Sequence, residues 1–335
     1  VTRAAKKVIY FLEGHGEDSI EQAETSGYSF VRDELQKLGY EVKKQTLALS
    51  DTFPQDCALL VVPGPQKDLL PNELDTIRNY LYEGGRVFFM VDPENAPGLV
   101  PYLGGFGVKL ENDVIVDTVS RLFGGDYFMP VITEYEFHEI TRNFRIATFF
   151  PYARSVEIAD SKPEGVTPTV LGKTSPNSWS ERQLDRKQVT FDKEKDKQGP
   201  IPLAVVATVK PKEEEKKEPE KTPEMKPGEE KKEGEQNKPA ALQARKEGRL
   251  AVVGDSDFVS NRYFNLSGNG NFFLNTANWL TEESDLISIQ PKTSSPRTVQ
   301  FTPSQGRIIF SVAVIILPLA TILLGISVWI RRRSL

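Results

Sequence analysis

Apolar runs of strand length alternate with amphipathic stretches along the first part of the chain. Between the runs, apolar residues at helical spacing predict one helix that ends at Gly39 and another that runs from Pro71 to Gly84-Gly85. The predicted strands are 8–12, 40–47, 58–62 and 86–91, and the predicted apolar helix faces are Tyr28, Val31, Leu35 and Leu38, and Leu74, Ile77 and Leu81. Strands that alternate with helices in this way form a mostly parallel sheet that is covered on both faces. The pattern therefore predicts an α/β fold with an open, mostly parallel sheet.

The strand pattern returns on both sides of a long polar segment. Residues 201–209 and 250–253 have the composition of buried strands, and a helix is predicted near 271–282. Between the two strands, residues 210–247 are rich in Lys, Glu and Pro and cannot bury enough apolar surface to offset the entropy of ordering. We therefore expect a disordered insertion that interrupts the fold, and extra strands and loops in the less regular section 110–200.

Residues 308–330 form an uncharged stretch that is followed at once by arginines at 331–333. As a helix this stretch would be roughly 34 Å long, which is enough to cross the hydrocarbon core of a bilayer. A buried core helix is the alternative, although such helices rarely run so long without a polar face. The pattern predicts a transmembrane helix with a cytoplasmic tail at 331–335 and the preceding sequence outside the cytoplasm. Because the chain begins at Val1 without methionine, we expect a fragment or a processed form.

Composition limits the classes of function. The net charge of −5 gives no electrostatic reason to bind nucleic acid, and we expect no nucleic-acid partner. The single cysteine, Cys57, excludes an intrachain disulfide framework and a multi-cysteine metal site. No HExxH, phosphate-binding-loop or dinucleotide-binding motif is present, so no cofactor is expected.

Glycine-rich or polar turns follow several of the predicted strands. They are Gly14-His15-Gly16-Glu17 after the first strand, Pro63-Gly64-Pro65 after the third, Asp92-Pro93 after the fourth, and Gly254-Asp255-Ser256-Asp257 after 250–253. In open α/β sheets ligands bind beyond the carboxyl ends of the strands, where glycines allow close approach of the backbone. We therefore expect these turns to meet at one rim. The candidate ligand-binding residues are Gly14, His15, Gly16, Glu17, Gly64, Gly254, Asp255 and Asp257.

The polar side chains of this rim leave two interpretations open. His15 and Glu17 with Asp255 and Asp257 could hold a divalent metal, or they could fix turns by bonding to nearby backbone groups. We favour turn fixing over a metal, and we leave a ligand-binding role open.

Covalent catalysis is not predicted, and no residue is assigned as catalytic. Cys57 lies at the front of a buried strand and should be an inert core thiol. Ser256 follows a strand, but its surroundings lack the G-x-S-x-G elbow, and His138 lies far along the chain from both.

Ordered segments along the chain resemble a known family. The segments are FLEGHGE (11–17), PGPQKDLLPNELDTIRNYLYEGGRVFFMVDP (63–93), HEITRNF (138–144), GRLAVVGDSDF (248–258), GNFFLNTANWL (270–280) and LPLATILLGISVWIRRR (317–333). Together they resemble the GldG-type auxiliary proteins of ABC transporters, whose namesake is associated with gliding motility. The resemblance covers nearly the whole chain apart from the charged insertion.

This resemblance implies a glutamine-amidotransferase-like α/β domain outside the cytoplasm, held between two membrane helices, the N-terminal one being absent from this chain. It also implies an ABC-2-type permease and a cytoplasmic ATPase as partners. The sequence departs from true class I amidotransferases because Pro63-Gly64-Pro65 offers no cysteine elbow and no late histidine–glutamate pair follows.

The sequence thus favours a non-enzymatic subunit of an ABC-2-type transport or export complex, anchored in the plasma (inner) membrane. Its rim would bind a glycan or another small ligand, or contact the permease. The alternatives are an anchored hydrolase or metal-dependent enzyme acting on cell-envelope glycans, and a structural scaffold. The expected organisation is an extracytoplasmic domain in two parts (1–209 and 248–292), the insertion (210–247), a linker (293–307), the transmembrane helix (308–330) and the tail (331–335).

Overall fold

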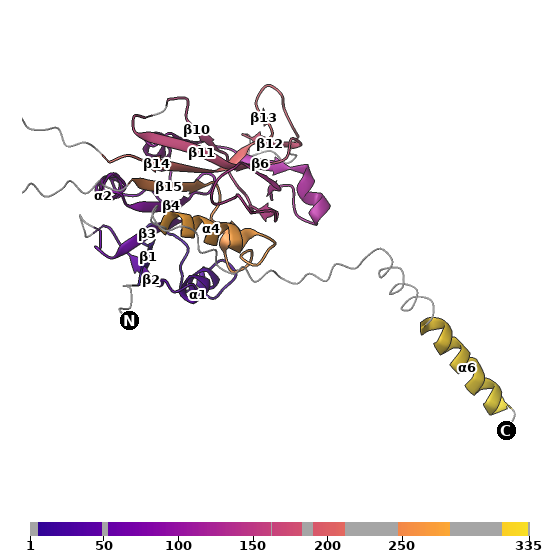
Figure 1. Cartoon of the computed structure of the whole chain (residues 1–335). Coiled ribbons are helices and arrows are strands. Elements are labelled where there is room, and N and C mark those ends of the chain that lie inside the picture. The colour runs from indigo at the N-terminus through magenta and orange to yellow at the C-terminus, as the bar shows by residue number, and fades with distance from the viewer. Residues whose placement is uncertain are drawn as a thin grey trace, which may run out of the picture. The chain divides into compact units, whose positions relative to one another are not determined.

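The structure is a computed structural model that describes residues 6–48, 53–161, 163–182, 190–211, 247–281 and 317–333. The chain divides into two compact units, Val1–Glu283 and Ser284–Leu335. Figure 1 shows a layered α/β arrangement in the first unit and a helix in the second.

Eight strands form the main sheet of the first unit. They are β1 (Val8–Leu12), β2 (Glu41–Gln45), β3 (Cys57–Pro63), β4 (Arg86–Met90), β8 (Glu134–Tyr135), β11 (Val166–Lys173), β14 (Pro202–Val209) and β15 (Gly248–Val253). Their order in the sheet is β2-β1-β3-β4-β15-β14-β11-β8. Neighbouring strands from β2 to β15 are parallel, whereas β14, β11 and β8 extend the sheet with antiparallel pairings. The predicted α/β fold with a large, mostly parallel sheet is confirmed.

Helices cover both faces of this sheet (Figure 1). The helices are α1 (Ser29–Lys37), α2 (Pro71–Tyr82), α3 (Leu99–Gly104) and α4 (Asn269–Thr281), with the short 3-10 helices η1 (Thr118–Phe123) and η2 (Asp257–Val259). Along β1, Ile9 and Phe11 join the apolar cluster under α1 and α4, while Val8, Tyr10 and Leu12 join the cluster under α2 and α3. Alternate residues of a strand point to opposite faces, so one short strand supports both halves of the core.

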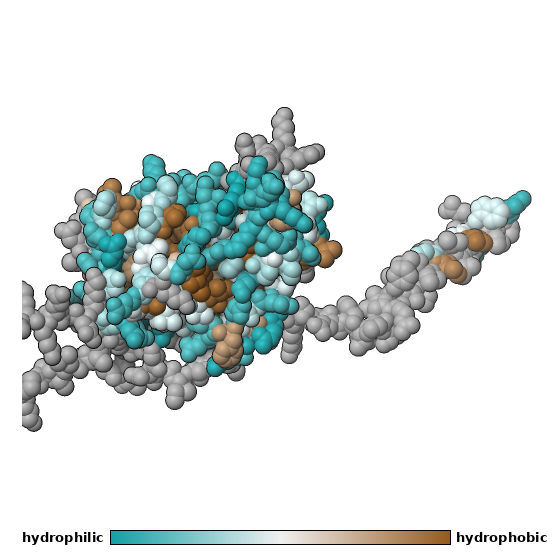
Figure 2. Space-filling model, turned by 90° about the horizontal axis from the view of Figure 1, so that it is seen from above, coloured by the Kyte–Doolittle hydropathy of each residue, from teal (hydrophilic) through white to brown (hydrophobic). Residues whose placement is uncertain are grey.

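The face of the molecule seen from above is mostly hydrophilic, with apolar side chains gathered near its middle (Figure 2).

The section between α3 and β14 contributes small sheets beside the main one. These strands are β5 (Val108–Leu110) with β10 (Val156–Ile158), β6 (Val114–Asp117) with β12 (Ser178–Glu181) and β13 (Lys197–Gln198), and β7 (Val131–Ile132) with β9 (Thr148–Phe149). They lie where the sequence predicted extra strands and loops, and that prediction is confirmed.

One residue of a predicted helix face is placed differently by the structure. Leu38 was expected to pack inward with Leu35, but it is 42% exposed. The helix α1 ends at Lys37, and Gly39 turns the chain toward β2 with φ +94°. Leu38 therefore lies in the turn after the helix, and its side chain is not held against the sheet. The predicted stop at Gly39 itself is confirmed.

The strands on the two sides of the charged insertion belong to one sheet, because β14 and β15 pair directly and Val209 lies opposite Gly248. The predicted insertion 210–247 falls almost entirely outside the described residues, as does the predicted linker 293–307. In the second unit, the helix α6 (Leu317–Arg333) is described, whereas the earlier part of the predicted span, 308–316, is not. Among the described residues, no helix has both the length and the apolar character that a membrane crossing requires.

Candidate functional site

The four predicted turns do meet at one edge of the sheet. They follow β1, β3, β4 and β15, which are adjacent and parallel, so their carboxyl ends lie side by side. The N–H of Asp18 donates to the carbonyl of Pro63 at 2.9 Å, which joins the first two turns. The N–H of Ser256 donates to Asp92 Oδ1 at 2.6 Å, which joins the last two. The expectation of a shared rim is correct.

Ser256 is the polar centre of this rim. Its Oγ lies 2.7 Å from Asp92 Oδ2 and 3.3 Å from Asp18 Oδ2, within hydrogen-bond distance of both carboxyl groups. Below it, the buried hydroxyl of Tyr28 donates to the Ser256 carbonyl. Gly64 lies against the same group with φ +66°, and a Cβ there would collide with Ser256 Oγ and come within 3.0 Å of Asp92 Oδ2. Only glycine fits this position without displacing the serine.

Asp18, Gly64, Asp92 and Ser256 line a cavity of about 440 Å³. Its walls come from the four strand-end turns and from the loop that carries Tyr152. The lining residues are Asp18, Ser26, Gly64, Gln66, Asp92, Pro93, Glu94, Asn95, Tyr152, Ser256 and Asp257. Among these described residues, none is a lysine, an arginine or a histidine. The cavity is therefore an acidic site of the size that holds a small ligand.

Burial raises the pKa values of the carboxyl groups in the site, which makes them weaker acids than usual. Desolvation, followed by repulsion from Asp92 and Asp257, raises the pKa of Asp18 to about 7. Desolvation also raises the pKa of Asp92 to about 6, against the lowering effect of its hydrogen bonds from Ser256. The pKa of Asp257 is raised by burial, although Arg262 opposes the shift. Near neutral pH the cluster therefore holds part of its protons, and any group that neutralises the carboxylates would displace them.

Asp255 is the deepest acid of the cluster. It is 1% exposed, and its Oδ1 accepts the N–H of Asp257 at 2.9 Å. Burial, with repulsion from Asp92 and Asp257, raises its pKa well above the ordinary value. Its Oδ2 has no hydrogen-bond partner among the residues that the structure describes. A buried side-chain oxygen without a hydrogen-bond partner is unusual in folded proteins.

His15 occupies a different place from the one its position in the sequence suggested. Its side chain is 10% exposed and lies between two fully buried carboxylates, with Nε2 2.8 Å from Glu73 Oε2 and Nδ1 3.2 Å from Glu17 Oε1. Glu73 belongs to the first turn of α2, and its Oε2 also accepts the N–H of Leu70 at 2.8 Å. The imidazole therefore connects the turn after β1 to the start of α2.

The backbone of His15 holds the same two segments together. Its carbonyl accepts the N–H groups of Gln66 and Lys67, each at 3.0 Å. Gly14 and Gly16 on either side have φ values of +135° and +88°, which favour glycine. The turn-fixing interpretation of Gly-His-Gly-Glu thus has direct geometric support, and the ring does not line the acidic cavity.

The structure separates the predicted site residues into two groups. Gly64 and Asp257 line the cavity. Gly14, His15, Gly16 and Glu17 form the neighbouring turn, Asp255 lies beneath the rim, and Gly254 packs so closely on the backbone of Arg154 that a Cβ would collide with its carbonyl. Ligand binding by these residues stays a prediction.

Sequence reasoning left several residues of the site unassigned. Asp92 was noted only as part of a turn, and Ser256 was considered only as a nucleophile, although both follow strands and so carried the signal used for the others. Asp18 lies just beyond the glycine turn, and its charge was the available signal. Glu73 has no local signal for its partnership with His15, because it lies in a helix far along the chain.

The predicted metal alternative finds no matching geometry. The imidazole of His15 lies between Glu17 and Glu73, while Asp257 lines the acidic cavity. Within the described parts of the chain, no group of three or more His, Cys, Asp or Glu side chains is arranged to hold a metal ion.

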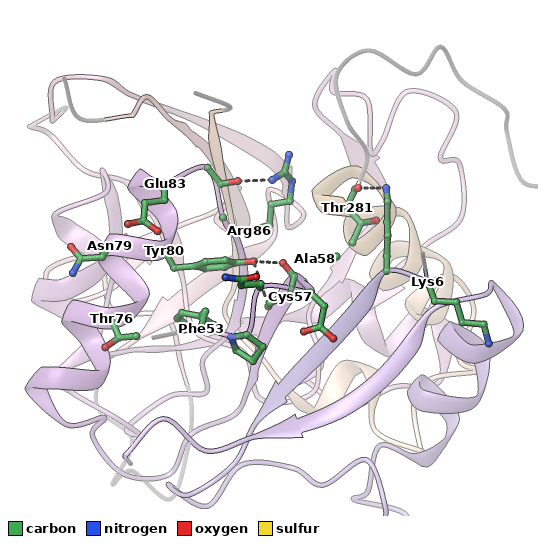
Figure 3. Close-up of a pocket in the computed structure, with 16 residues that line it drawn as sticks. Lys6, Phe53, Cys57, Ala58, Thr76, Asn79, Tyr80, Glu83, Arg86 and Thr281 are labelled. Carbon is green, nitrogen blue, oxygen red and sulfur yellow. Dashed lines mark hydrogen bonds between the residues drawn. The ribbon is translucent and has the colours of Figure 1, made fainter. Parts of the chain in front are cut away.

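A second cavity, of about 750 Å³, lies at the opposite edge of the sheet, where the strands begin (Figure 3). Tyr80 crosses it, and its hydroxyl donates to the carbonyl of Cys57 at 3.0 Å. Burial raises the pKa of the Cys57 thiol to about 11, which leaves little thiolate at neutral pH. Lys7 closes another side through a 2.6 Å hydrogen bond to the Thr281 carbonyl. The thiol is unreactive by this chemistry, as the sequence predicted.

Neither histidine of the chain contacts the Ser256 hydroxyl. The hydroxyl of Ser256 is beside carboxyl groups, the imidazole of His15 lies between Glu17 and Glu73, and His138 packs edge-on against Trp279 at 5.0 Å. The imidazole base of a Ser-His pair is therefore not present beside Ser256, because both histidines have other contacts. Fold and site together define an α/β domain with an acidic cavity at the carboxyl ends of its parallel strands.

The chain belongs to the family described as "ABC-type uncharacterized transport system", which matches it over residues 6–279. Members of this family are auxiliary components of ABC transport systems. This agrees with the expectation of a non-enzymatic protein. The expected association with an ABC transport system is thereby confirmed at the level of the family.

Several solved structures are similar to the chain at low sequence identity. The mmIFT52 N-terminal domain is 13% identical with a TM-score of 0.54, over 83% of this chain and 100% of that one. A ThuA-like protein from Bacteroides uniformis is 12% identical with a TM-score of 0.41, over 84% and 94% of the two chains. A cytoplasmic protein from Salmonella typhimurium LT2 is 11% identical with a TM-score of 0.45, over 82% and 99%. No curated protein matches the chain. The similarity to the first of these structures shows a shared fold. It gives no information about function.

Proposed function

We propose that this protein is a membrane-anchored, non-enzymatic auxiliary subunit of an ABC-2-type transport or export complex, of the GldG type. Its partners are a permease and a cytoplasmic ATPase. The single observation that carries the proposal is the family match over residues 6–279, which includes all the strand-end turns of the rim. The motifs at 11–17, 63–93 and 248–258 that resemble GldG-type proteins are the segments that build this rim.

The acidic cavity is the part of the domain that recognises a ligand or a partner. It lies at the carboxyl ends of parallel strands, which is where open α/β sheets bind ligands. An amidotransferase-like ancestry explains a cavity at this place without catalytic groups. The domain would then recognise the cargo or the permease through polar contacts. The energy for transport would come from the ATPase.

The anchor is assigned to residues 308–330, with 331–335 on the cytoplasmic side and the α/β unit outside the cytoplasm of the plasma (inner) membrane. This assignment is supported by the uncharged sequence of 308–330 and by the arginines that follow it. An anchored domain of this kind stays beside the permease at high local concentration, so weak contacts are enough for recognition.

Affinity purification from native membranes in mild detergent tests the proposal. The tagged full chain should bring down a permease and an ATPase, identified by mass spectrometry. The matched control is the same tagged chain ended after residue 283, which keeps the α/β unit and removes 284–335. We expect the control to leave the membrane fraction and to lose both partners. Recovery of folded full chain without either partner would contradict the proposal.

No observation favours the alternative of an enzyme that acts on cell-envelope glycans. Neither histidine contacts Ser256, and no group of side chains in the described residues is arranged to hold a metal ion. The scaffold alternative differs in one measurable respect, since substitutions in the cavity would then change stability without changing the binding of any ligand or partner.

A further inference from the structure

We propose that the carboxyl group of Asp18 acts as a proton-sensitive latch. In its protonated form it holds the loop 17–27 against Ser256, and the loss of the proton releases this end of the loop. The loop lies between β1 and α1, and its residues Asp18 and Ser26 line the acidic cavity. The inference rests on the proposed function, because it describes how one wall of the proposed recognition cavity is regulated.

The first argument is the number of protons at the Ser256 hydroxyl. Its Oγ lies 2.7 Å from Asp92 Oδ2 and 3.3 Å from Asp18 Oδ2. A serine hydroxyl has one proton to donate, and its oxygen can accept further hydrogen bonds. The shorter contact, to Asp92, takes that proton. Asp18 can then bond to the serine oxygen only as a donor, which requires a protonated carboxyl group.

The ionised form of Asp18 makes no favourable contact at the same place. Its Oδ2 would face an oxygen whose only proton is directed at Asp92, and it would also lie near the carboxylate of Asp92 itself. Like charges that meet in a partly buried site repel one another. The same geometry that closes the latch in the protonated form therefore opens it when the proton is lost.

The surroundings of Asp18 place this change near neutral pH. Desolvation, followed by repulsion from Asp92 and Asp257, raises the pKa of Asp18 to about 7, and the groups that shift it include no cation. Arg154 and Arg262 act instead on Asp92 and Asp257. The charged and titratable groups around the latch are Tyr28 before α1, Asp92 and Glu94 after β4, Tyr152 and Arg154 after β9, and Asp255, Asp257 and Arg262 after β15.

The two ends of the loop are held by different contacts. At the far end, Asn261 donates its N–H to the Gly27 carbonyl at 2.8 Å and its side-chain amide to the Glu24 carbonyl at 2.7 Å. At the near end, the N–H of Asp18 donates to the Pro63 carbonyl at 2.9 Å. Loss of the carboxyl contact therefore loosens the near end, while the far end stays attached.

Hydrogen–deuterium exchange of the full 335-residue chain in detergent tests the proposal. The readout is the protection of peptides that cover 17–21 at pH 6 and at pH 8, corrected for the intrinsic effect of pH on exchange. With a pKa of about 7, the protonated fraction of Asp18 falls from about 0.9 to about 0.1 over this range. Protection should fall roughly tenfold at 17–21 and stay constant in peptides from α4.

Two variants separate the proton from the rest of the side chain. Asp18→Asn carries a neutral amide that can donate to the serine oxygen at every pH, so protection should stay high at both values. Asp18→Ala has no donor, so protection should be low at both. Asp33→Asn is the matched control, since Asp33 is an exposed aspartate on α1 that pairs with Arg32, and it should keep the native pH dependence. Near-ultraviolet circular dichroism shows whether each variant is folded.

A direct readout of the proton accompanies the exchange data. In the chain labelled with ¹³C at its aspartate carboxyl groups, one resonance should titrate with a midpoint near pH 7 and should be missing from Asp18→Asn.

Three results would overturn the proposal. They are equal protection of 17–21 at pH 6 and pH 8 in the native chain, the native pH dependence in Asp18→Asn, and native protection in Asp18→Ala at pH 6. These results concern only the purified chain. A permease and an ATPase could still co-purify with the chain, so failure here is distinguishable from failure of the proposed function.

Discussion

The carboxylate of Asp92 accepts two hydrogen bonds from Ser256, one from the Ser256 N–H at 2.6 Å and one from the Ser256 Oγ at 2.7 Å. The two residues follow neighbouring parallel strands, β4 and β15, that are far apart in the sequence. This pair joins the strand that precedes the long middle section to the strand that follows the charged insertion. The floor of the acidic cavity therefore depends on contacts that form only when both parts of the α/β domain are in place.

Gly64→Ala should disturb this pair directly. Its Cβ would collide with Ser256 Oγ, and its φ of +66° is unfavourable for alanine. We expect the free energy of unfolding to fall by about 2–4 kcal/mol, from backbone strain plus overpacking. Gly124→Ala is the control, because Gly124 has φ +78° and nothing within 4 Å of its Cβ position. The control should lose only about 1–2 kcal/mol in urea unfolding. Equal losses in the two variants would show that the contact with Ser256 contributes nothing.

Asp18 should make the protein less stable as the pH rises. Its folded-state pKa is raised to about 7 from the ordinary 3.8, so the folded protein holds this proton more tightly than the unfolded chain does. Stability that is present below pH 4 is therefore lost progressively between about pH 4 and pH 7. We expect Asp18→Asn to flatten the fall of the melting temperature over this range, with Asp92, whose pKa is about 6, responsible for a remaining slope. Parallel curves for Asp18→Asn and native protein would rule out the assignment.

His15→Ala should lower the free energy of unfolding. It leaves the fully buried carboxylates of Glu17 and Glu73 without their shared partner. Removing one member of a buried polar pair leaves the other desolvated, so we expect a loss of roughly 2–4 kcal/mol in chemical denaturation. His138→Ala, which removes an edge-on ring contact with Trp279 and a 3.2 Å hydrogen bond from the Ile140 N–H to Nδ1, should lose about 1 kcal/mol. Equal losses in the two variants would show that the contacts of the His15 imidazole with Glu17 and Glu73 contribute nothing to stability.

Cys57 should react slowly with alkylating reagents in the folded protein. Burial raises the pKa of its thiol from 9.0 to about 11, and Tyr80 Oη lies 3.4 Å from its sulfur. The thiolate fraction at neutral pH falls about 100-fold with this shift, and the rate of reaction with iodoacetamide should fall at least as far relative to the chain unfolded in urea. Comparable rates in the two states would mean that the thiol is exposed and ionised.

Much of this site could be predicted from the sequence because parallel topology alone brings strand ends together. Once Val8–Leu12, the run at 58–62 and the late strand at 250–253 are assigned to one parallel sheet, Gly64 and Asp257 must share an edge. The strand order and the antiparallel extension by β14, β11 and β8 could not be predicted, because apolar runs carry no information about their neighbours.

The role of His15 shows a second limit of prediction from the sequence. The turn was predictable from Gly14 and Gly16, whereas the partnership with Glu73 depends on how α2 packs beside β1. The prediction for Leu38 was wrong for a related reason. The helix ends one residue earlier, at Lys37, so the side chain of Leu38 belongs to the turn and not to the helix face. Sequence periodicity locates elements and their edges, and tertiary packing decides which side chain at an edge turns inward.

The measurement that tests the central claim most directly is a reciprocal purification that starts from the ATPase. Membranes that contain the full chain are solubilised in mild detergent, the tagged ATPase is isolated with its permease, and the subunits are quantified by mass spectrometry. The account predicts that the chain is recovered with both in a fixed, near-equal ratio. A preparation that retains the permease and lacks the chain would contradict it.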